Sequence, residues 1–233
     1  MRLDRFLANA GYGTRKEVKE LIKAKRISVN GDFKVKDSQS VDYNKDEICI
    51  DGEKIEYKEF YYILLNKPKG YISATDDYIQ NTVLDLVPEY AFAHLFPVGR
   101  LDKDTTGLLI LTNDGQLAHQ LITPKKHVDK VYIATLDKPL DMKIKDKFEN
   151  GIILDEELTL PATLEKVDEN IAKVTIHQGK YHQVKRMFEY FDYKVIELDR
   201  IQLAFLTLGD LEIGEYRELT TEEVDKLKSL SSK

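Results

Sequence analysis

The chain has 233 residues, of which 42% are hydrophobic and 33% charged, and its net charge is −6. This composition is typical of a soluble globular protein. No apolar run reaches the roughly 20 residues that a membrane-spanning helix needs. The first residues lack the apolar core of a signal peptide, and the single cysteine excludes an intramolecular disulfide and disfavours a cysteine-built metal site. We therefore expect a cytoplasmic protein with no membrane partner and no bound metal.

The charge is distributed unevenly along the chain. Residues 1–36 carry ten Lys or Arg and four Asp or Glu, a net charge of +6, which leaves −12 for residues 37–233. A basic head on an acidic body suggests that the head binds a polyanion. A charged helix that is merely solvated is the alternative explanation.

Residues 1–57 have the pattern of a compact unit. An apolar stripe over residues 3–10 predicts a first helix, and a capping box at residues 14–17 opens a second. Asn30-Gly31 and Asp51-Gly52 each follow a short strand pattern, and both dipeptides are typical of tight turns that need positive φ. This head is thus expected to fold as a domain of its own.

Three features of the head are more specific: a start of the form R-L-D-x-F-L, a second helix rich in basic residues, and the sequence I-x-V-N-G. With these features the head resembles the RNA-binding domain named after ribosomal protein S4. The resemblance implies that the second helix and the following turn lie on folded RNA and contact phosphates rather than base edges. The basic residues expected at this RNA surface are Arg2, Arg5, Arg15, Lys16, Lys19, Lys23 and Arg26.

A short linker is expected at residues 58–59, followed by a larger domain over residues 60–233. Strand patterns rich in β-branched and aromatic residues occur at residues 60–65, 131–136, 171–177 and 194–198, and helical patterns at 180–191 and after the capping box at 220–223. Mixed order without a regular βαβ repeat indicates an α+β domain with a mostly antiparallel mixed sheet.

The sequence VGRLDKDTTGLLILTNDG, residues 98–115, places Arg100, Asp102 and Asp104 just ahead of a fully apolar run. A calcium loop is disfavoured because Asn113 stands where a bidentate Glu is required. A phosphotransferase motif of the form D-x-D-x-T is also disfavoured, because Gly99 and Arg100 precede Asp102 where a buried aliphatic strand is expected.

A third interpretation makes Asp102 the nucleophile or general base of a site that handles RNA. A carboxylate beside a polyanion needs a positive neighbour to stay ionised, and Arg100 lies two residues away, on the same side of an extended segment. The competing explanation is a structural ion pair between Arg100 and Asp102 at the entrance of a strand.

Four motifs occur in one order along the chain: N-K-P-x-G-Y at residues 66–71, G-R-L-D-x-x-T-x-G-L-L at 99–109, K-x-Y at 130–132 and G-x-Y-H-Q-V-K-R-M at 179–187. Together they resemble the pseudouridine synthases, isomerases that convert a uridine of RNA into pseudouridine. The resemblance implies that Asp102 is the catalytic nucleophile, that Tyr132 packs on the target uracil, and that Lys185 pairs with Asp102.

The resemblance also suggests roles for other basic residues. Arg100 is expected to contact the phosphate of the flipped nucleotide or to fill the gap that it leaves. Lys67, Lys69 and Lys180 are expected to contact RNA phosphates. His182 lies within a motif but needs no catalytic role. The reaction gains and loses no atom, so we expect no cofactor.

Residues 73–77 and 82–85, together with the chain length, are most similar to the subfamily that modifies 16S ribosomal RNA. The expected partner is therefore 16S rRNA, or a 30S assembly intermediate, bound by a monomer. Two alternatives remain: a 23S rRNA synthase of the same family, and a catalytically inactive RNA-binding protein associated with the ribosome.

Overall fold

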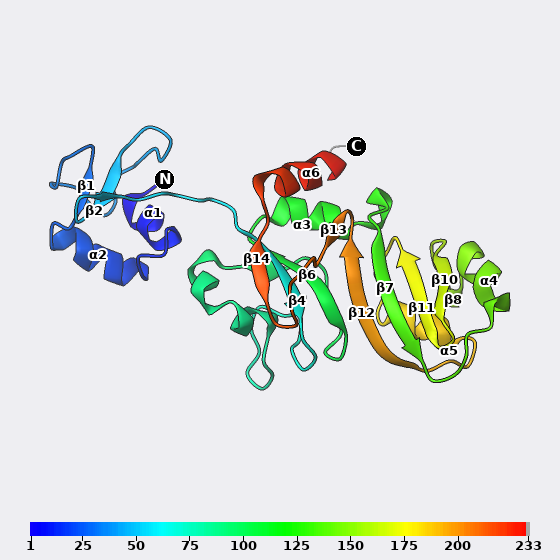
Figure 1. The fold of residues 1–233 in the computed structure, drawn as a ribbon. Coiled ribbons are helices and arrows are strands. Elements are labelled where there is room, and N and C mark those ends of the chain that lie inside the picture. The colour runs from blue at the N-terminus through cyan, green and yellow to red at the C-terminus, as the bar shows by residue number, and fades with distance from the viewer. Residues whose placement is uncertain (232–233) are drawn as a thin grey trace. The chain divides into compact units, whose positions relative to one another are not determined.

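A computed structural model describes residues 1–231 of the chain and divides into two compact units (Figure 1). The first unit comprises Met1–Tyr61 together with Pro88–His94, and the second contains Tyr62–Val87 and the chain from Leu95 onward. This grouping follows compactness alone, so the domain boundary at residues 58–59 stays a prediction. No helix within residues 1–231 is long and apolar enough to cross a membrane.

The first unit packs two helices against a small antiparallel sheet. Its elements are α1 (Leu3–Asn9), α2 (Arg15–Lys23), β1 (Ile27–Val29), β2 (Ile48–Ile50), β3 (Glu53–Lys54) and the 3₁₀ segment η2 (Pro88–Ala93). The capping box is confirmed, because Thr14 N donates to the Glu17 carboxylate at 2.7 Å and Glu17 N donates to Thr14 Oγ1 at 3.3 Å. Leu3, Phe6, Leu7 and Val18 are among the fully buried residues of its core.

Both tight turns of the first unit have the predicted backbone. Asn30 and Gly31 have φ values of 52° and 80°, and Asp51 and Gly52 have 51° and 87°. The Asp51-Gly52 turn joins β2 to β3, as expected of a hairpin. The Asn30-Gly31 turn instead follows β1 and is closed only by a bridge between Val29 and Asp32, since the partner strand of β1 is β2.

The second unit is built on a large sheet with the central order β10-β11-β7-β12-β6-β4-β14. Its strands are β4 (Tyr62–Lys67), β5 (Phe96–Pro97), β6 (Thr106–Thr112), β7 (Lys130–Leu136), β10 (Thr163–Asp168), β11 (Ile171–Ile176), β12 (Val195–Leu203), β13 (Leu206–Thr207) and β14 (Tyr216–Glu218). All neighbours are antiparallel except β12 and β6, so the predicted α+β fold with a mostly antiparallel mixed sheet is confirmed. The strand expected at residues 194–198 runs five residues further, to Leu203.

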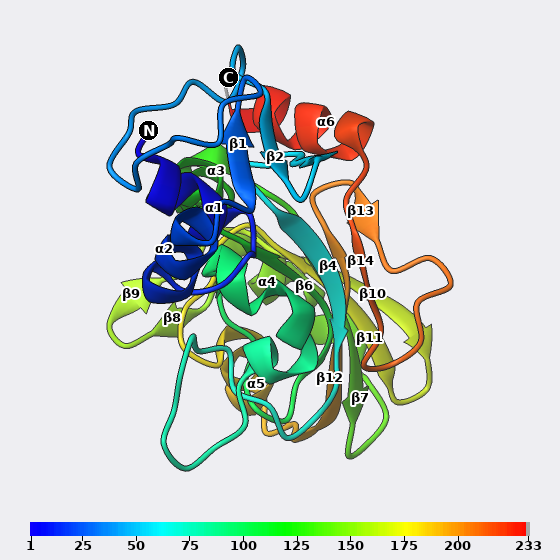
Figure 2. The same cartoon turned by 90° about the vertical axis from the view of Figure 1, so that its left-hand side faces the viewer.

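Helices cover this sheet and close its core. They are α3 (Gly115–Ile122), α4 (Lys145–Asn150), α5 (Gln183–Glu189) and α6 (Thr221–Ser231), with 3₁₀ segments η1 (Val83–Leu86), η3 (Pro124–Lys126) and η4 (Met142–Ile144) and a separate hairpin of β8 (Ile153–Leu154) and β9 (Glu157–Leu158). Helices α3 and α6 lie side by side (Figures 1 and 2) and pack on residues of β4 and β6 in one apolar cluster.

The helix predicted at residues 180–191 is confirmed as α5, with its buried face where the spacing indicated. Val184, Met187 and Phe188 are all buried. The helix begins only at Gln183 because His182 has a left-handed backbone, with a φ of 49°, which ends the preceding loop abruptly. This turn places His182 and the start of α5 next to the segment that carries Asp102. His182 and Asp102 therefore line the same cavity.

Candidate active site

Asp102 lies in the loop that joins β5 to β6, directly before the fully buried strand β6. Within the loop, Thr105 N donates to the Asp102 carbonyl at 3.1 Å and closes a turn. The Ser73 hydroxyl fastens the preceding residue on both sides, because Leu101 N donates to Ser73 Oγ at 3.0 Å and Oγ donates to the Leu101 carbonyl at 2.9 Å. The backbone that carries the carboxylate is therefore fixed before any substrate binds.

Lys67 also holds this loop in place, through hydrogen bonds to its backbone. Its Nζ donates to the carbonyls of Asp102 at 3.1 Å and Thr105 at 2.9 Å, and also to those of Pro68 and Lys103. The side chain is fully buried at the end of β4, and this burial lowers the pKa of Lys67 to about 8 against the raising effect of the Asp104 and Asp102 charges. A lysine in this position reaches no solvent, so the predicted phosphate contact of Lys67 is corrected to a structural role.

Lys185 reaches Asp102 from α5. Its Nζ lies 2.9 Å from Asp102 Oδ2 and 2.7 Å from Asp104 Oδ1, so one ammonium bridges the two carboxylates. The expected proximity of Lys185 and Asp102 is thus present. The second partner, Asp104, was not among the predicted site residues, although its position two residues after Asp102 puts it within reach of the same ammonium.

The bridge changes the acid–base properties of its members. Burial by itself would lower the pKa of Lys185, but its hydrogen bonds to Asp104 and Asp102, together with their charges, outweigh burial and raise the pKa above its ordinary value. The hydrogen bond from Lys185 lowers the pKa of Asp104. Lys185 is therefore a permanent positive charge at the site rather than a proton donor.

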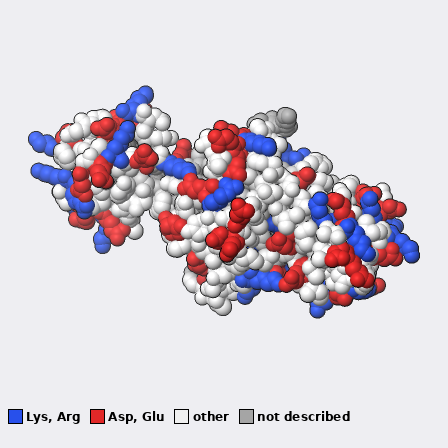
Figure 3. All heavy atoms as spheres, in the orientation of Figure 1, with Lys and Arg blue, Asp and Glu red and all other residues white. Residues whose placement is uncertain are grey.

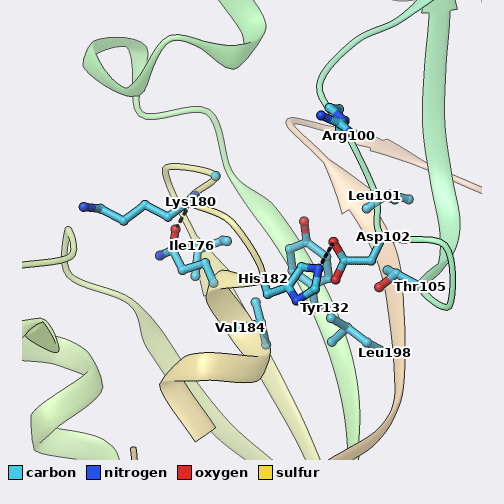
Figure 4. A pocket seen from close by; sticks show the side chains of 12 residues that line it. Arg100, Leu101, Asp102, Thr105, Tyr132, Ile176, Lys180, His182, Val184 and Leu198 are labelled. Atoms are coloured by element: carbon cyan, nitrogen blue, oxygen red, sulfur yellow. Dashed lines mark hydrogen bonds and ion pairs between the residues drawn. The ribbon is translucent and has the colours of Figure 1, made fainter. Parts of the chain in front are cut away.

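His182 is a member of the site that the sequence did not assign. Its Nε2 lies 3.4 Å from Asp102 Oδ1, and its ring stacks on Tyr181 with 3.8 Å between ring centroids. The left-handed backbone of His182 directs the ring toward Asp102, as Figure 4 shows. The signal for this contact was the histidine within G-x-Y-H-Q-V, which was assigned no catalytic role.

Two cavities meet at Asp102. The smaller, of about 70 Å³, is lined by Asp102, His182 and Tyr132 together with apolar side chains that include Val184 and Leu198 (Figure 4). The larger, of about 780 Å³, shares Asp102, Tyr132 and His182 and extends to residues of α3 and β12. Tyr132, which is 7% exposed, comes from β7 and presents an aromatic surface to both.

The other predicted basic residues of this unit take different positions. Arg100 is exposed and lines both cavities beside Asp102. Lys69 is exposed and pairs with Glu197 at 2.8 Å. Lys180 is part of the lining of both cavities. Its side chain nevertheless extends away from Asp102 (Figure 4), and it pairs with Glu157.

The predicted RNA surface of the first unit divides into paired and unpaired cations. Figure 3 shows Lys and Arg side chains interspersed with Asp and Glu on this unit. Four of the seven residues form ion pairs, namely Arg2 with Asp4, Lys19 with Asp37, Lys23 with Glu20 and Arg26 with Asp51. Arg5, Arg15 and Lys16 are exposed, and within residues 1–231 they form no ion pair.

No group of three or more His, Cys, Asp or Glu side chains in the described part of the chain is arranged to hold a metal ion. Two carboxylates of the site, those of Asp102 and Asp104, share Lys185 as their counterion. The chemistry that this arrangement supports is nucleophilic attack by a carboxylate that is held beside an aromatic ring and a fixed positive charge.

Comparison with known proteins decides the family. Residues 61–190 match the model of RNA pseudouridylate synthase, and residues 1–33 match the S4 domain. The chain belongs to the RNA pseudouridylate synthase family. Members of this family are isomerases that act on RNA, and the predictions of an RNA isomerase with an S4 domain at its head are confirmed.

Individual relatives cover nearly the whole chain. An uncharacterized RNA pseudouridine synthase of Bacillus subtilis is 44% identical over 97% of this chain and 98% of its own length. The ribosomal small subunit pseudouridine synthase A of Vibrio cholerae is 42% identical over 96% and 98%, and the ribosomal large subunit pseudouridine synthase B of Bacillus subtilis is 40% identical over 99% and 96%. A crystal structure of a pseudouridylate synthase, 38% identical, matches 97% of this chain and 99% of that chain with a TM-score of 0.69.

Proposed function

We propose that this protein isomerises one uridine of small-subunit ribosomal RNA to pseudouridine, with Asp102 as the nucleophile. The observation that carries the assignment of the nucleophile is the position of its carboxylate, which lines both cavities beside Tyr132 while Lys185 contacts Oδ2 at 2.9 Å. A nucleophile held by a fastened loop and a fixed counterion needs no rearrangement to react.

The reaction must break the bond between C1′ of the ribose and N1 of uracil, turn the base, and join C1′ to C5. C5 loses its proton and N1 gains one, so the atoms balance without a co-reactant. A uridine of folded RNA must first leave its stack, and the ring of Tyr132 offers an aromatic surface in compensation. Asp102 supplies the nucleophilic carboxylate, and Lys185 offsets its charge beside the RNA.

The choice of small-subunit RNA is supported by residues 73–77 and 82–85 and by the relative from Vibrio cholerae. The Bacillus subtilis relative named for the large subunit is almost equally similar, at 40% against 42% identity. Large-subunit RNA is therefore the second candidate substrate. We further propose that the protein acts in the cytoplasm as a monomer, on 16S rRNA or a 30S assembly intermediate.

The test uses small-subunit and large-subunit rRNA transcripts that carry tritium at C5 of uridine, because isomerisation releases this tritium to water. The enzyme and its Asp102→Asn variant, which removes the charge and keeps the shape, are assayed on each transcript. We expect stoichiometric release from small-subunit RNA by the wild type and none by the variant.

Release from large-subunit RNA alone would keep the chemistry and reject the proposed substrate. Full activity of Asp102→Asn would reject the nucleophile. Absence of release from both transcripts is followed by the same assay on 30S assembly intermediates, and failure there would reject the proposed activity in favour of RNA binding alone.

A further inference from the structure

The larger cavity is lined by two cations that the proposed reaction does not use. Lys130 and Arg200 both line this cavity, together with the apolar side chains of Leu121 and Leu203. Neither cation lines the smaller cavity at Asp102. The two positive groups therefore belong to a separate part of the site.

The strand register places this pair beside Tyr132. Lys130 and Tyr132 are two residues apart on β7, and Arg200 of β12 lies directly opposite Tyr132. Side chains alternate between the faces of a sheet, and directly opposed residues share a face. Lys130, Tyr132 and Arg200 consequently project from the same face, the one that lines the larger cavity.

Both cations are deeply buried without a counterion. Lys130 is 7% exposed and Arg200 2%, and neither forms an ion pair within residues 1–231. Lys130 Nζ donates to the Val128 carbonyl at 3.2 Å and Arg200 Nε to the Leu108 carbonyl at 2.7 Å. Arg200 Nη2 is buried and has no hydrogen-bond partner in this part of the chain. A buried positive charge is costly unless an anion compensates it.

The pKa of Lys130 reflects its burial beside a second cation. Burial, together with the neighbouring charge of Arg200, lowers the pKa of Lys130 to about 8, against the opposing effect of Asp129. The carboxylate of Asp129 itself lies 3.0 Å from His177 Nδ1. An anion bound between Lys130 and Arg200 would favour the charged form of the lysine.

The backbone of Arg200 is held in place by a glycine of the catalytic motif. Gly107 of β6 pairs with Arg200 of β12 and has a φ of 100°. A Cβ at position 107 would lie 2.4 Å from the Arg200 carbonyl oxygen and 2.6 Å from Asp199 Oδ1. The close approach of the two strands therefore requires glycine here and fixes the place from which the guanidinium projects.

We propose that Lys130 and Arg200 form an anion subsite that binds a backbone phosphate of the RNA, next to the uridine that reaches Asp102. This inference rests on the proposed function, which brings RNA to the cavity. A phosphodiester carries one negative charge and several acceptor oxygens, and thus suits an ammonium and an incompletely paired guanidinium better than a neutral base does. The subsite lies beside Tyr132 and positions the RNA strand on the sheet.

The test measures binding of the small-subunit rRNA transcript as a function of salt concentration. All proteins carry Asp102→Asn, so that no turnover occurs. The variants are Lys130→Gln, which removes the charge and keeps a polar side chain, Lys130→Arg, which keeps the charge, and Lys143→Gln. The last is the matched control, because Lys143 is an exposed lysine of the same unit outside both cavities.

Affinity for RNA falls as salt rises, so the slope of log affinity against log salt is negative. We expect Lys130→Gln to make this slope shallower by about 1, the value of one phosphate contact, and Lys130→Arg to restore the steeper slope. Lys143→Gln should keep the slope of the Asp102→Asn parent. A Lys130→Gln slope equal to that of the parent would overturn the subsite. If this variant lacks the cooperative unfolding transition of the parent, Lys130→Met replaces it in the same titration, with the same criterion.

The two proposals fail separately. If the wild type releases no tritium but Lys130→Gln makes the salt slope shallower, the isomerisation is rejected and the anion subsite stands. If the wild type releases tritium and the slope does not change, the isomerisation stands and the subsite is rejected.

Discussion

The two units use positive charge in opposite ways. In the first unit, Arg15 and Lys16 are exposed side chains on a helix, where we expect salt to screen their predicted attraction to RNA. In the second, Lys67, Lys130 and Arg200 are buried within or beside the large sheet. We expect the exposed cations of the first unit to attract RNA over a solvated surface, whereas buried Lys67 fixes a backbone loop and the buried pair Lys130 and Arg200 contacts a single phosphate in the proposed subsite. A count of basic residues in the sequence finds the first kind and cannot recognise the second.

The largest effect that this comparison predicts is at Lys67. We expect Lys67→Met to lower the free energy of unfolding by about 3 kcal/mol, because buried carbonyls lose their donor. Turnover should fall by about 100-fold, because the loop that carries Asp102 is no longer held in position. Urea unfolding and tritium release measure the two effects.

The matched control is Lys69→Met, two residues away. Lys69 is exposed and pairs with Glu197 at the surface, so its loss should change the free energy of unfolding by less than about 0.5 kcal/mol. Equal effects of the two substitutions would contradict the structural role of Lys67.

The next effect concerns the glycine beside Arg200. We expect Gly107→Ala to destabilise the protein by about 2–4 kcal/mol, because positive φ and a Cβ 2.4 Å from the Arg200 carbonyl oxygen act together. Gly115→Ala at the start of α3 is the control, since a Cβ there meets nothing within 4 Å. Thermal unfolding of both variants measures the two changes in stability. A Gly107→Ala variant as stable as the wild type would show that β6 and β12 can separate without cost.

The sequence allowed much of the fold to be predicted, because its signals are local. Capping boxes at Thr14 and Thr220, positive-φ turns at Asn30 and Asp51, and the buried spacing of α5 all depend on neighbours within a few residues. The approach of Lys185 to Asp102 was also anticipated, because both lie in recognisable motifs.

The missed features depend on contacts between distant segments. The sequence around Lys67 gives no sign that its side chain is buried, and we therefore predicted a phosphate contact. The structure shows four backbone carbonyls as its partners instead. His182 reaches Asp102 only because its own left-handed backbone turns the chain just before α5. Arg200 pairs with Gly107 across a parallel strand contact, for which a single sequence provides no signal.

A smaller effect is expected from pH. The pKa of Lys130 is lowered to about 8 in the folded state, mainly by burial, so the unfolded state binds more protons between about pH 8 and the ordinary value of 10.5. Stability from this group therefore rises with pH across that window. Between pH 8 and pH 9.5 we expect the wild type to gain about 1.5 kcal/mol relative to Lys130→Gln in urea unfolding. Parallel curves for both proteins would contradict this.

The smallest effect on chemistry is expected in the first unit. The double variant Arg15→Gln and Lys16→Gln should weaken RNA binding and make the salt slope shallower by about 2, with turnover at saturating RNA unchanged. The control is the double variant Lys23→Gln and Arg26→Gln, which removes cations already paired with Glu20 and Asp51 and should change the slope less. A larger loss in the control would place the RNA on the paired residues instead.

The most direct test of the difference between the units compares the Lys185→Gln variant with the double variant at Arg15 and Lys16. For each, the single-turnover rate at saturating RNA and the dissociation constant are measured on the same transcript. We predict that Lys185→Gln slows the rate by about 100-fold and leaves the dissociation constant within about twofold, because it removes the fixed counterion of Asp102. The double variant at Arg15 and Lys16 should raise the dissociation constant and leave the single-turnover rate at saturating RNA unchanged. A Lys185→Gln variant that weakens binding but keeps its rate would contradict the account.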